Sequence, residues 1–344
     1  MRKEQLMIIN FQQLLKNNYL INQDIEQVEK LLKQYLDCDL KIAHNIAHHL
    51  VDAGGKRIRP ILLLLVAKLF NYKDQDHILL AMILELLHTA TLLHDDVVDI
   101  SEIRRSNKTA NCIWSNSSCI LVGDLLHARA FNAITQVKDQ AIVRYLASVT
   151  EEIVQGELLQ LLHCFDITTD ETIYFEIINK KTAKLFELAA KSATMLTQQN
   201  QIVQQQFAEY GKLIGMSFQL IDDILDYSGN PIKIGKNIGD DLREGKPSLL
   251  IIYALQHAAV TDQQYIKDLF SKNNSLDKSY IEQEQVLKIY DIIKSCGAIN
   301  YAKNICQKFN QQAKKIIIDL AVPHDKQIAN ILIQLLRDLA VRIT

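Results

Sequence analysis

The stretch "ILLAMILELLHTATLLHDDVVD", residues 78–99, is an apolar run of helical length that ends in three carboxylates. Its helical periodicity predicts a buried helix. Asp95 and Asp99 are spaced i, i+4, so on a helix they share one face about one turn apart. Like charges at this spacing repel, and acid near a helix C-terminus is also unfavourable. The acid therefore lowers local stability, which indicates that a ligand offsets it.

The rest of the chain has the same helical character. Its 344 residues include only 11 glycines and 4 prolines, so helix-breaking residues are rare. Helical periodicity recurs at 25–36, 59–70 and 182–196, and no stretch alternates convincingly like a strand. Residues 1–20 are polar and weakly patterned, and no Pro- or Ser-rich linker divides the remainder. We predict a loosely ordered lead over 1–20 and one all-α domain over 21–344.

The composition excludes several classes of protein. A net charge of −2 gives no bulk attraction to nucleic acid or to anionic lipid. The apolar run "ILLLLVA" at 61–67 is far shorter than the roughly twenty residues of a transmembrane helix. The basic N-terminus has too short an apolar run for a signal peptide. None of the six cysteines forms a CxxC pair, which is typical of a reducing compartment. We expect a soluble cytoplasmic protein.

A second stretch, "LIDDILDY" at Leu220–Tyr227, repeats the pattern DDxxD. Asp222 and Asp226 again share one helical face. Oxygen ligands at one-turn spacing suit Mg²⁺, which keeps several waters and bridges to phosphate oxygens. One such motif alone could be a solvated acidic face. Two motifs, each embedded in an apolar helix, favour several Mg²⁺ ions held against a diphosphate.

Three basic segments supply the cations that a diphosphate also needs. "GGKRIRP" at 54–60 places three cations after a Gly-Gly turn, and its proline suits the first turn of a helix, whose N–H groups favour an anion. "EIRRSNK" at 102–108 follows the first acidic motif, and "GKNIGDDLREGKPS" at 235–248 follows the second. Each segment alone could be a solvated loop. Acidic motifs that are each followed by a basic loop predict a metal–diphosphate site.

The histidines admit two interpretations. His88 lies seven residues before Asp95, two turns along the same face, where it could donate to a phosphate or be structural. His44 and His48, in "HNIAHH", have the i, i+4 spacing of a zinc pair. No third ligand is evident nearby in the sequence, so the ordinary structural role is favoured for this pair.

Together these segments resemble the trans-isoprenyl diphosphate synthase, or polyprenyl synthetase, family. The resemblance runs from about residue 25 to the C-terminus. It is carried by "GGKRIRP", "ELLHTATLLHDDVVDISEIRR", "VGDLLHARAF", "KTAKLFELAA" and "FQLIDDILDY". Within the family the motifs are most similar to the long-chain synthases that make quinone side chains, with an octaprenyl product expected.

The resemblance implies an all-α bundle around a deep central cavity, usually as a homodimer. It also implies a reaction. An allylic diphosphate, here farnesyl diphosphate, is bound through Mg²⁺ on both motifs and ionises. Isopentenyl diphosphate attacks the allylic cation, a proton is lost, and the cycle repeats. A soluble enzyme of this kind could contact the membrane transiently when it releases its product.

Matching motif positions gives each candidate residue a role. The metal ligands would be Asp95, Asp96, Asp99, Asp222 and Asp226. Isopentenyl diphosphate would contact Lys56, Arg59, His88 and Arg105. The allylic diphosphate would contact Arg104, Lys181, Thr182, Gln219, Lys236 and Lys246. One departure is local, because this chain has Ser248 and Leu250 where relatives often carry Thr and Pro.

Product length is expected to depend on the helix below the first motif. Ala90 and Thr91 lie about 6–7.5 Å down that helix from Asp95, and both side chains are small. Leu87, nearly one turn deeper than Ala90, is aliphatic rather than aromatic. In this family a bulky residue at these positions is thought to stop chain growth. The small residues therefore predict a long-chain product.

Two other functions remain open at this stage. A terpene cyclase or a head-to-head condensing enzyme would also use aspartate-rich helices and Mg²⁺. Neither needs a second diphosphate pocket of the GGKRxRP kind, which this chain has. A non-catalytic partner subunit of a synthase would be expected to have lost acidic or basic motif residues, and none is lost here.

Overall fold

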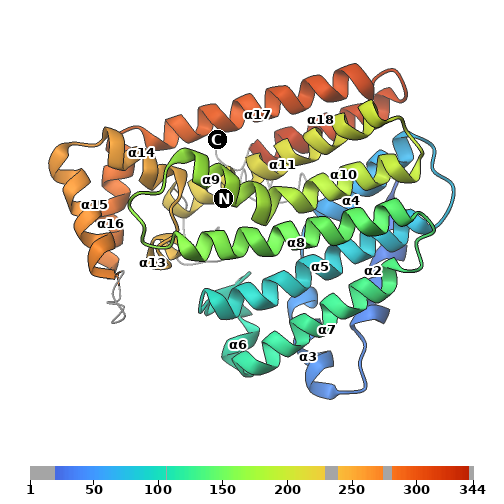
Figure 1. Ribbon diagram of the computed structural model, residues 1–344, viewed down its shortest axis with the longest axis horizontal. Coiled ribbons are helices and arrows are strands. Elements are labelled where there is room, and N and C mark those ends of the chain that lie inside the picture. The colour runs from blue at the N-terminus through green and yellow to red at the C-terminus, as the bar shows by residue number, and fades with distance from the viewer. Residues whose placement is uncertain (1–19, 106, 229–238, 274–280, 341–344) are drawn as a thin grey trace, which may run out of the picture.

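The computed structural model describes residues 20–105, 107–228, 239–273 and 281–340, which form an almost entirely helical bundle (Figure 1). The first half of the chain contains α2 Asn22–Leu36, α3 Lys41–Asp52, α4 Ile58–Leu69, α5 Asp76–Val98, β1 Ile103–Arg104, β2 Asn107–Lys108, α6 Ala110–Ile113, α7 Asn116–Ile134 and α8 Gln140–Leu162. The all-α prediction is confirmed. The predicted lead falls outside the described residues, apart from Leu20.

The second half is equally helical. It contains α9 Glu171–Ile178, the π-helix η1 Asn179–Ala183, α10 Lys184–Leu196, α11 Gln201–Ser228, α13 Asp240–Arg243, α14 Leu249–His257, α15 Val260–Asn273, α16 Gln283–Ser295, α17 Ala298–Leu320 and α18 Lys326–Ala340. Ser248 is the N-cap residue of α14, and Leu250 is buried in its first turn. The substitutions noted in the sequence thus fall where a helix begins.

Helix α5 is the core helix that carries the first acidic motif. Its 23 residues are long and apolar enough to cross a membrane, but 72% of the apolar window is buried inside the fold. It packs against α4, α7 and α2. Because neighbouring helices already cover its apolar surface, we interpret α5 as a core helix.

Helices α10 and α11 form the other half of the core. Helix α10 packs against α4 and α11, and α11 in turn packs against α17 and α18. In Figure 1, α17 runs along the top of the molecule, α7 lies in the lower part above α3, and α8 crosses in front. Helix α10 thus contacts both of the helices that carry an acidic motif, α5 and α11.

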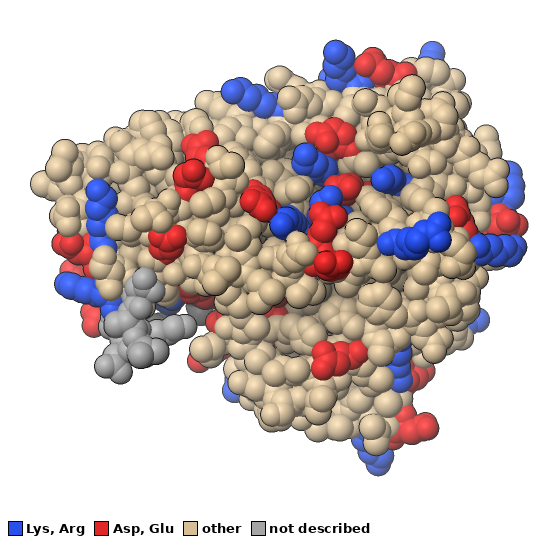
Figure 2. All heavy atoms as spheres, viewed as in Figure 1, with Lys and Arg blue, Asp and Glu red and all other residues tan. Residues whose placement is uncertain are grey.

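The connections between helices carry the basic segments. The only strands in the described residues form a two-residue hairpin, with Ile103 opposite Lys108 and Arg104 opposite Asn107. This hairpin falls within the predicted basic loop and turns it back toward the end of α5. Figure 2 shows acidic and basic side chains interleaved near the middle of the visible face, over α8.

Candidate active site

Three cations from three different segments contact the acidic motif of α5. Arg104 Nε donates to Asp96 Oδ1 at 2.7 Å, and Asp96 is only 1% exposed. Lys246 Nζ donates to Asp99 Oδ2 at 2.8 Å. Lys181 Nζ lies 3.9 Å from Asp95 Oδ1. The structure thus brings together the first aspartate motif and three of the cations predicted for the allylic diphosphate.

These pairs shift the protonation equilibria of their members. Burial opposes ionisation of Asp99, but the positive charges of Lys246 and Lys181 outweigh it and lower the pKa of its carboxyl. Burial also disfavours the charged form of Lys181, yet the carboxylates of Asp95 and Glu157 raise the pKa of its ammonium. These shifts favour the charged forms of Asp99 and Lys181.

The structure adds acidic residues that sequence reasoning missed. Lys181 Nζ contacts Glu157 Oε2 on α8, and Lys246 Nζ contacts both Glu244 and Asp241, the latter at 3.7 Å. Burial, then repulsion from Asp95, raises the pKa of Glu157 to about 7. Burial, together with the charges of Asp99 and Asp241, likewise raises the pKa of Glu244 to about 7, against the opposing effect of Lys246.

This excess of acid fits the donor set for divalent metal ions. Carboxylates crowded enough to raise each other's pKa values are stabilised by a dication, and Mg²⁺ prefers oxygen ligands. A sequence signal existed for the added residues, because Asp241 and Glu244 lie inside "GDDLREGK" and Glu157 inside "QGEL". Neither segment shows the DDxxD spacing on which the sequence analysis relied.

The second motif is held by neutral donors. Tyr174 Oη donates to Asp223 Oδ2 at 2.6 Å, and Gln219 Nε2 donates to Asp223 Oδ1 at 2.8 Å. Thr182 Oγ1 donates in turn to Gln219 Oε1 at 2.9 Å. Burial raises the pKa of Asp223 to about 7. Asp223, which the sequence analysis did not select, thus joins α9, η1 and α11 in one hydrogen-bonded network.

Helix α13 connects the two motifs electrostatically. Its Asp241 lies 3.7 Å from Lys246, the partner of Asp99. The charge of Asp241 also contributes to the raised pKa of Asp223. Asp222 is half-buried and Asp226 is 7% exposed, so the second motif is largely shielded from solvent.

The π-helix η1 positions Lys181 and Thr182. A Cβ atom at Gly156 of α8 would lie 2.5 Å from the backbone nitrogen of Lys181, and one at Gly215 of α11 would lie 2.4 Å from the Cα of Ala183. Only glycine therefore lets α8 and α11 approach η1 this closely. Single π-turns inserted between helices are frequent at functional sites, because they redirect side chains.

A cluster of arginines, called the basic pocket below, surrounds His88 and shares Arg104 with the first acidic motif. Burial, then the positive charges of Arg59, Arg105, Arg104 and Arg57, lowers the pKa of His88 well below its usual value. The imidazole is therefore neutral at physiological pH, with several guanidinium groups within electrostatic reach. This concentration of positive charge in the interior is suited to an anion.

Arg59 gives the clearest sign of a missing anionic partner. Its guanidinium stacks over the Phe186 ring, 4.5 Å from the centroid, and its buried Nε has no hydrogen-bond partner among the described residues. Burial lowers the pKa of Arg59 to about 10, against a single opposing contribution from Glu85. A buried guanidinium without a paired carboxylate is costly unless an anion binds to it.

Neighbouring residues keep this pocket in shape. Arg57, in left-handed conformation with φ of 49°, donates to Glu29 at 2.6 Å and to Glu85 at 2.7 Å. Burial and the charge of Arg57 lower the pKa of Arg105, against the opposing charge of Glu85. Glu85 is a further residue that the sequence analysis missed, and it neutralises Arg57 while leaving the other arginines available.

For the remaining predicted residues other than Lys236, the structure gives a position or a burial. Lys56 is exposed at the start of the pocket, and Lys236 lies outside the described residues. Leu87 and Ala90 are 2% and 0% exposed in the core, and Thr91 Oγ1 donates to the carbonyl of His88 at 2.9 Å. Their role in product length stays a prediction.

A helical bundle with two opposed aspartate motifs and a cationic pocket is the architecture of a prenyltransferase. Residues 40–290 match the family model described as polyprenyl synthetase, and the chain belongs to that family. The predicted resemblance is confirmed, and the terpene cyclase alternative is not supported.

The similar proteins include long-chain synthases. The chain is 34% identical over 310 residues to octaprenyl diphosphate synthase of Escherichia coli, covering 90% of this chain and 93% of that protein. It is 38% identical over 282 residues to the geranyl-diphosphate-specific all-trans-nonaprenyl-diphosphate synthase of Rhodobacter capsulatus, covering 82% and 84%. A solved polyprenyl synthase of Caulobacter crescentus, complexed with calcium and isoprenyl diphosphate, superimposes with a TM-score of 0.88 at 30% identity over 96% of this chain and 97% of that one.

Proposed function

We propose that the protein is a long-chain all-trans polyprenyl diphosphate synthase. It condenses isopentenyl diphosphate repeatedly onto farnesyl diphosphate and releases octaprenyl diphosphate or a near homologue. The similarity to octaprenyl and nonaprenyl synthases supports a long product. The small side chains of Ala90 and Thr91 below the first motif support it as well.

The observation that carries the proposal is the presence of two clusters of charged side chains, one mainly basic and one rich in carboxylates. In the pocket of Arg59, His88 and Arg105 the buried Nε of Arg59 has no hydrogen-bond partner among the described residues, and arginines outnumber carboxylates, so the pocket suits a diphosphate bound without metal. The acidic site around Asp95 and Asp222 suits a diphosphate bound through metal. Two anionic substrates with different binding modes are what a condensation reaction requires.

The allylic site would hold Mg²⁺ through Asp95, Asp96, Asp99, Asp222 and Asp226. When bound, Mg²⁺ neutralises the charge that develops on a departing diphosphate. Lys181 and Lys246 already lie against the motif, so they can exchange a carboxylate partner for a diphosphate oxygen and stabilise the same charge. Lys236 belongs to the same basic segment and is proposed for the same role.

Other residues orient the substrates and exclude water. Gln219 is fixed by Thr182 on one side and by Asp223 on the other, so its amide keeps one orientation beside the second motif. The apolar length of α5 keeps water from a carbocation that forms at its acidic end. We propose that a deep central cavity receives the growing chain, with Leu87, Ala90 and Thr91 on its wall.

Assembly and location are part of the same proposal. Large apolar side chains are exposed on two helices that are adjacent in sequence, α7 and α8, namely Ile120, Leu121, Val154, Leu158, Leu161 and Leu162. Exposed apolar surface of this kind is typical of an interface, which supports a homodimer. We propose a cytoplasmic enzyme whose product becomes the side chain of a respiratory quinone, with transient membrane contact during product release.

The decisive experiment is product analysis. The full chain is incubated with farnesyl diphosphate, labelled isopentenyl diphosphate and Mg²⁺, and the products are separated by chromatography after removal of the diphosphate. We expect a series of products that ends at about eight isoprene units, because no bulky residue lies near the motif to stop chain growth early. Failure to consume isopentenyl diphosphate would refute the synthase, and a cyclic product would favour the cyclase.

A further inference from the structure

The turn between α2 and α3 brings two histidines and a carboxylate together. Asp37 is the C-cap of α2, and His44 and His48 lie on successive turns of α3. Asp37 Oδ1 lies 3.5 Å from His44 Nδ1 and 3.2 Å from His48 Nε2. The three ligand atoms all lie within 4.8 Å of one another. The sequence suggested a zinc pair without a third ligand, and the fold supplies that ligand from the preceding helix.

The two distances from Asp37 to the histidines are close to those between ligands of one metal ion. Zinc binds histidine nitrogen at about 2.0–2.1 Å and carboxylate oxygen at about 2.0–2.2 Å, so two ligands of a tetrahedral ion lie roughly 3.3–3.5 Å apart. The contacts of Asp37 with His44 and His48 fall at 3.5 Å and 3.2 Å. The longer of the two exceeds the usual range for an N–H···O hydrogen bond, about 2.7–3.2 Å.

A second carboxylate lies behind the pair. Asp52 Oδ2 is 3.5 Å from His48 Nδ1, the ring nitrogen that faces away from Asp37. A histidine ligand usually contacts a carboxylate or carbonyl through its other nitrogen, which orients the ring, and Asp52 lies within ion-pair distance of that nitrogen, beyond hydrogen-bond range. Among the described residues, the ion pairs of Asp37 and Asp52 are made with these histidines and with no lysine or arginine. The group is therefore net negative when the histidines are neutral, which favours a dication.

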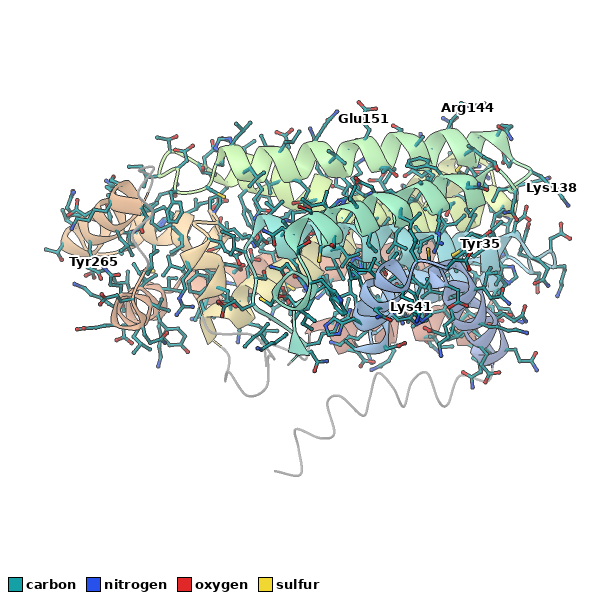
Figure 3. All side chains as sticks on the ribbon, turned by 90° about the horizontal axis from the view of Figure 1, so that it is seen from below. Tyr35, Lys41, Lys138, Arg144, Glu151 and Tyr265 are labelled. Carbon is teal, nitrogen blue, oxygen red and sulfur yellow. The ribbon has the colours of Figure 1, made fainter. Side chains whose placement is uncertain are left out.

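The exposure of the group leaves room for solvent ligands. The side chain of His48 is only 19% exposed, whereas that of Asp37 is 62% exposed. The turn lies on the underside of the molecule, where Tyr35 and Lys41 are labelled in Figure 3. An ion held there would have three protein ligands and an open position for water, as in many zinc sites.

A second group of the same composition is less suitable. His94, Asp124 and His127 also place ligand atoms within 4.8 Å of one another. However, His94 Nε2 lies 3.1 Å from the carbonyl oxygen of Ile120, a backbone acceptor outside the group, and a hydrogen bond to it requires a proton on this nitrogen. A protonated nitrogen cannot bind a metal ion at the same time.

We propose that Asp37, His44 and His48 bind Zn²⁺ or a similar transition-metal ion, with Asp52 orienting His48. The site is separate from the diphosphate chemistry and does not depend on the function proposed above. Its structural consequence follows from α3, which leads directly into the "GGKRIRP" segment and whose His49 Nε2 lies 2.8 Å from the carbonyl oxygen of Lys108. A bound ion would fix the α2–α3 turn and with it the start of the basic pocket.

The test is a metal titration of the full chain in excess Mg²⁺, which occupies the aspartate motifs. Zn²⁺ binding is measured by competition with a chromophoric chelator, and Co²⁺ is used as a spectroscopic probe of coordination. The wild type should bind one equivalent more than the double variant His44→Ala/His48→Ala, and this equivalent should give the intense visible bands of tetrahedral Co²⁺. His127→Ala, from the competing group, is the matched control and should keep the extra equivalent.

Two further variants sharpen the outcome. Asp52→Asn should lower the affinity about 10–100-fold without changing the number of ions bound, because it removes only the outer carboxylate. If the double variant lacks wild-type helicity, Asp37→Asn gives the same comparison with both histidines in place. The proposal is overturned if the double variant, or Asp37→Asn, binds as many ions as the wild type, or if His127→Ala removes the extra equivalent.

Discussion

The two aspartate motifs share one sequence pattern, but the fold gives them different surroundings. On α5 the middle carboxylate, Asp96, is buried against the cation of Arg104. On α11 the middle carboxylate, Asp223, is buried against the neutral donors Tyr174 and Gln219. The difference teaches that the middle residue of each motif holds the site together, by charge in one motif and by hydrogen bonds in the other.

The helices also differ one and two turns below their motifs. Seven residues before the first aspartate, α5 has His88 in the basic pocket, whereas α11 has Gly215 packed on η1. Five residues before the first aspartate, α5 has the small Ala90. At the equivalent position of α11, the hydroxyl of Ser217 donates to Asn310 Oδ1 on α17 at 3.0 Å. Helix α5 thus lies next to the proposed substrates, and α11 is anchored to the outer helices.

Substitution of the first aspartate should have the same effect in both motifs, because both motifs need this residue equally. Asp95→Ala and Asp222→Ala should each lower kcat by about 10³-fold, since both carboxylates act on the charge of the leaving diphosphate. Turnover is measured with labelled isopentenyl diphosphate, and circular dichroism controls for helicity. Near-normal turnover in both folded variants would remove the basis for the metal assignment.

Substitution of the middle aspartate should affect the stability of the two motifs differently. Asp96→Asn leaves the guanidinium of Arg104 buried beside a neutral group, which should cost about 3 kcal/mol of unfolding free energy. Asp223→Asn keeps a neutral partner for Tyr174, whose hydroxyl can rotate to accept, and should cost about 1 kcal/mol. Urea unfolding measures both values. Equal losses would show that the two surroundings are energetically equivalent.

The basic pocket, which lies beside α5 and has no counterpart beside α11 in this comparison, should act on one substrate more than on the other. Arg59→Ala or His88→Ala should raise KM for isopentenyl diphosphate about 10–100-fold, as expected for a lost charge-assisted contact, with a smaller effect on the allylic primer. Arg104→Ala, beside the acidic motif, should show the opposite preference. The KM values for both substrates are measured for each variant, and equal effects would contradict the division into two pockets.

Product length should change with a substitution on α5 and not with one at the equivalent position of α11. Ala90→Tyr should place a ring below Asp95 and shorten the products to about three or four isoprene units, with a stability loss of about 1–3 kcal/mol from overpacking. Ser217→Ala, at the equivalent position of α11, is the control and should leave the products unchanged. Full-length products from Ala90→Tyr would show that another part of the fold limits chain growth.

The smallest effect concerns the pH dependence of stability. Because the pKa of His88 is lowered in the folded protein, the unfolded chain alone binds this proton below about pH 6.5. Wild-type stability should therefore fall, relative to His88→Gln, by up to about 1.4 kcal/mol per unit as pH decreases from about 7 to about 5. Above about pH 7 the difference should be constant. Urea unfolding across this range measures the trend, and parallel profiles would contradict it.

The helices and the two chemical motifs could be predicted from the sequence, because they depend on local spacing. The predicted helix at 78–99 is α5 at Asp76–Val98, and the predicted segment 182–196 is α10 at Lys184–Leu196 after the π-turn. Scarce glycine and proline made these segments easy to recognise. The pairs Asp95–Asp99 and Asp222–Asp226 follow from the i, i+4 geometry of any helix.

The partners of those motifs were decided by tertiary structure. Lys246 is 147 residues from Asp99, and Tyr174 is 49 residues from Asp223, so no local pattern predicts either contact. The raised pKa values of Glu157 and Asp223 likewise come from burial and from charges on other helices. The sequence by itself determined the helices and the chemistry that each one carries. Only the packing of α5, α11 and η1 determined which groups meet, because burial and electrostatic interactions act between residues that are close in space and far apart in the chain.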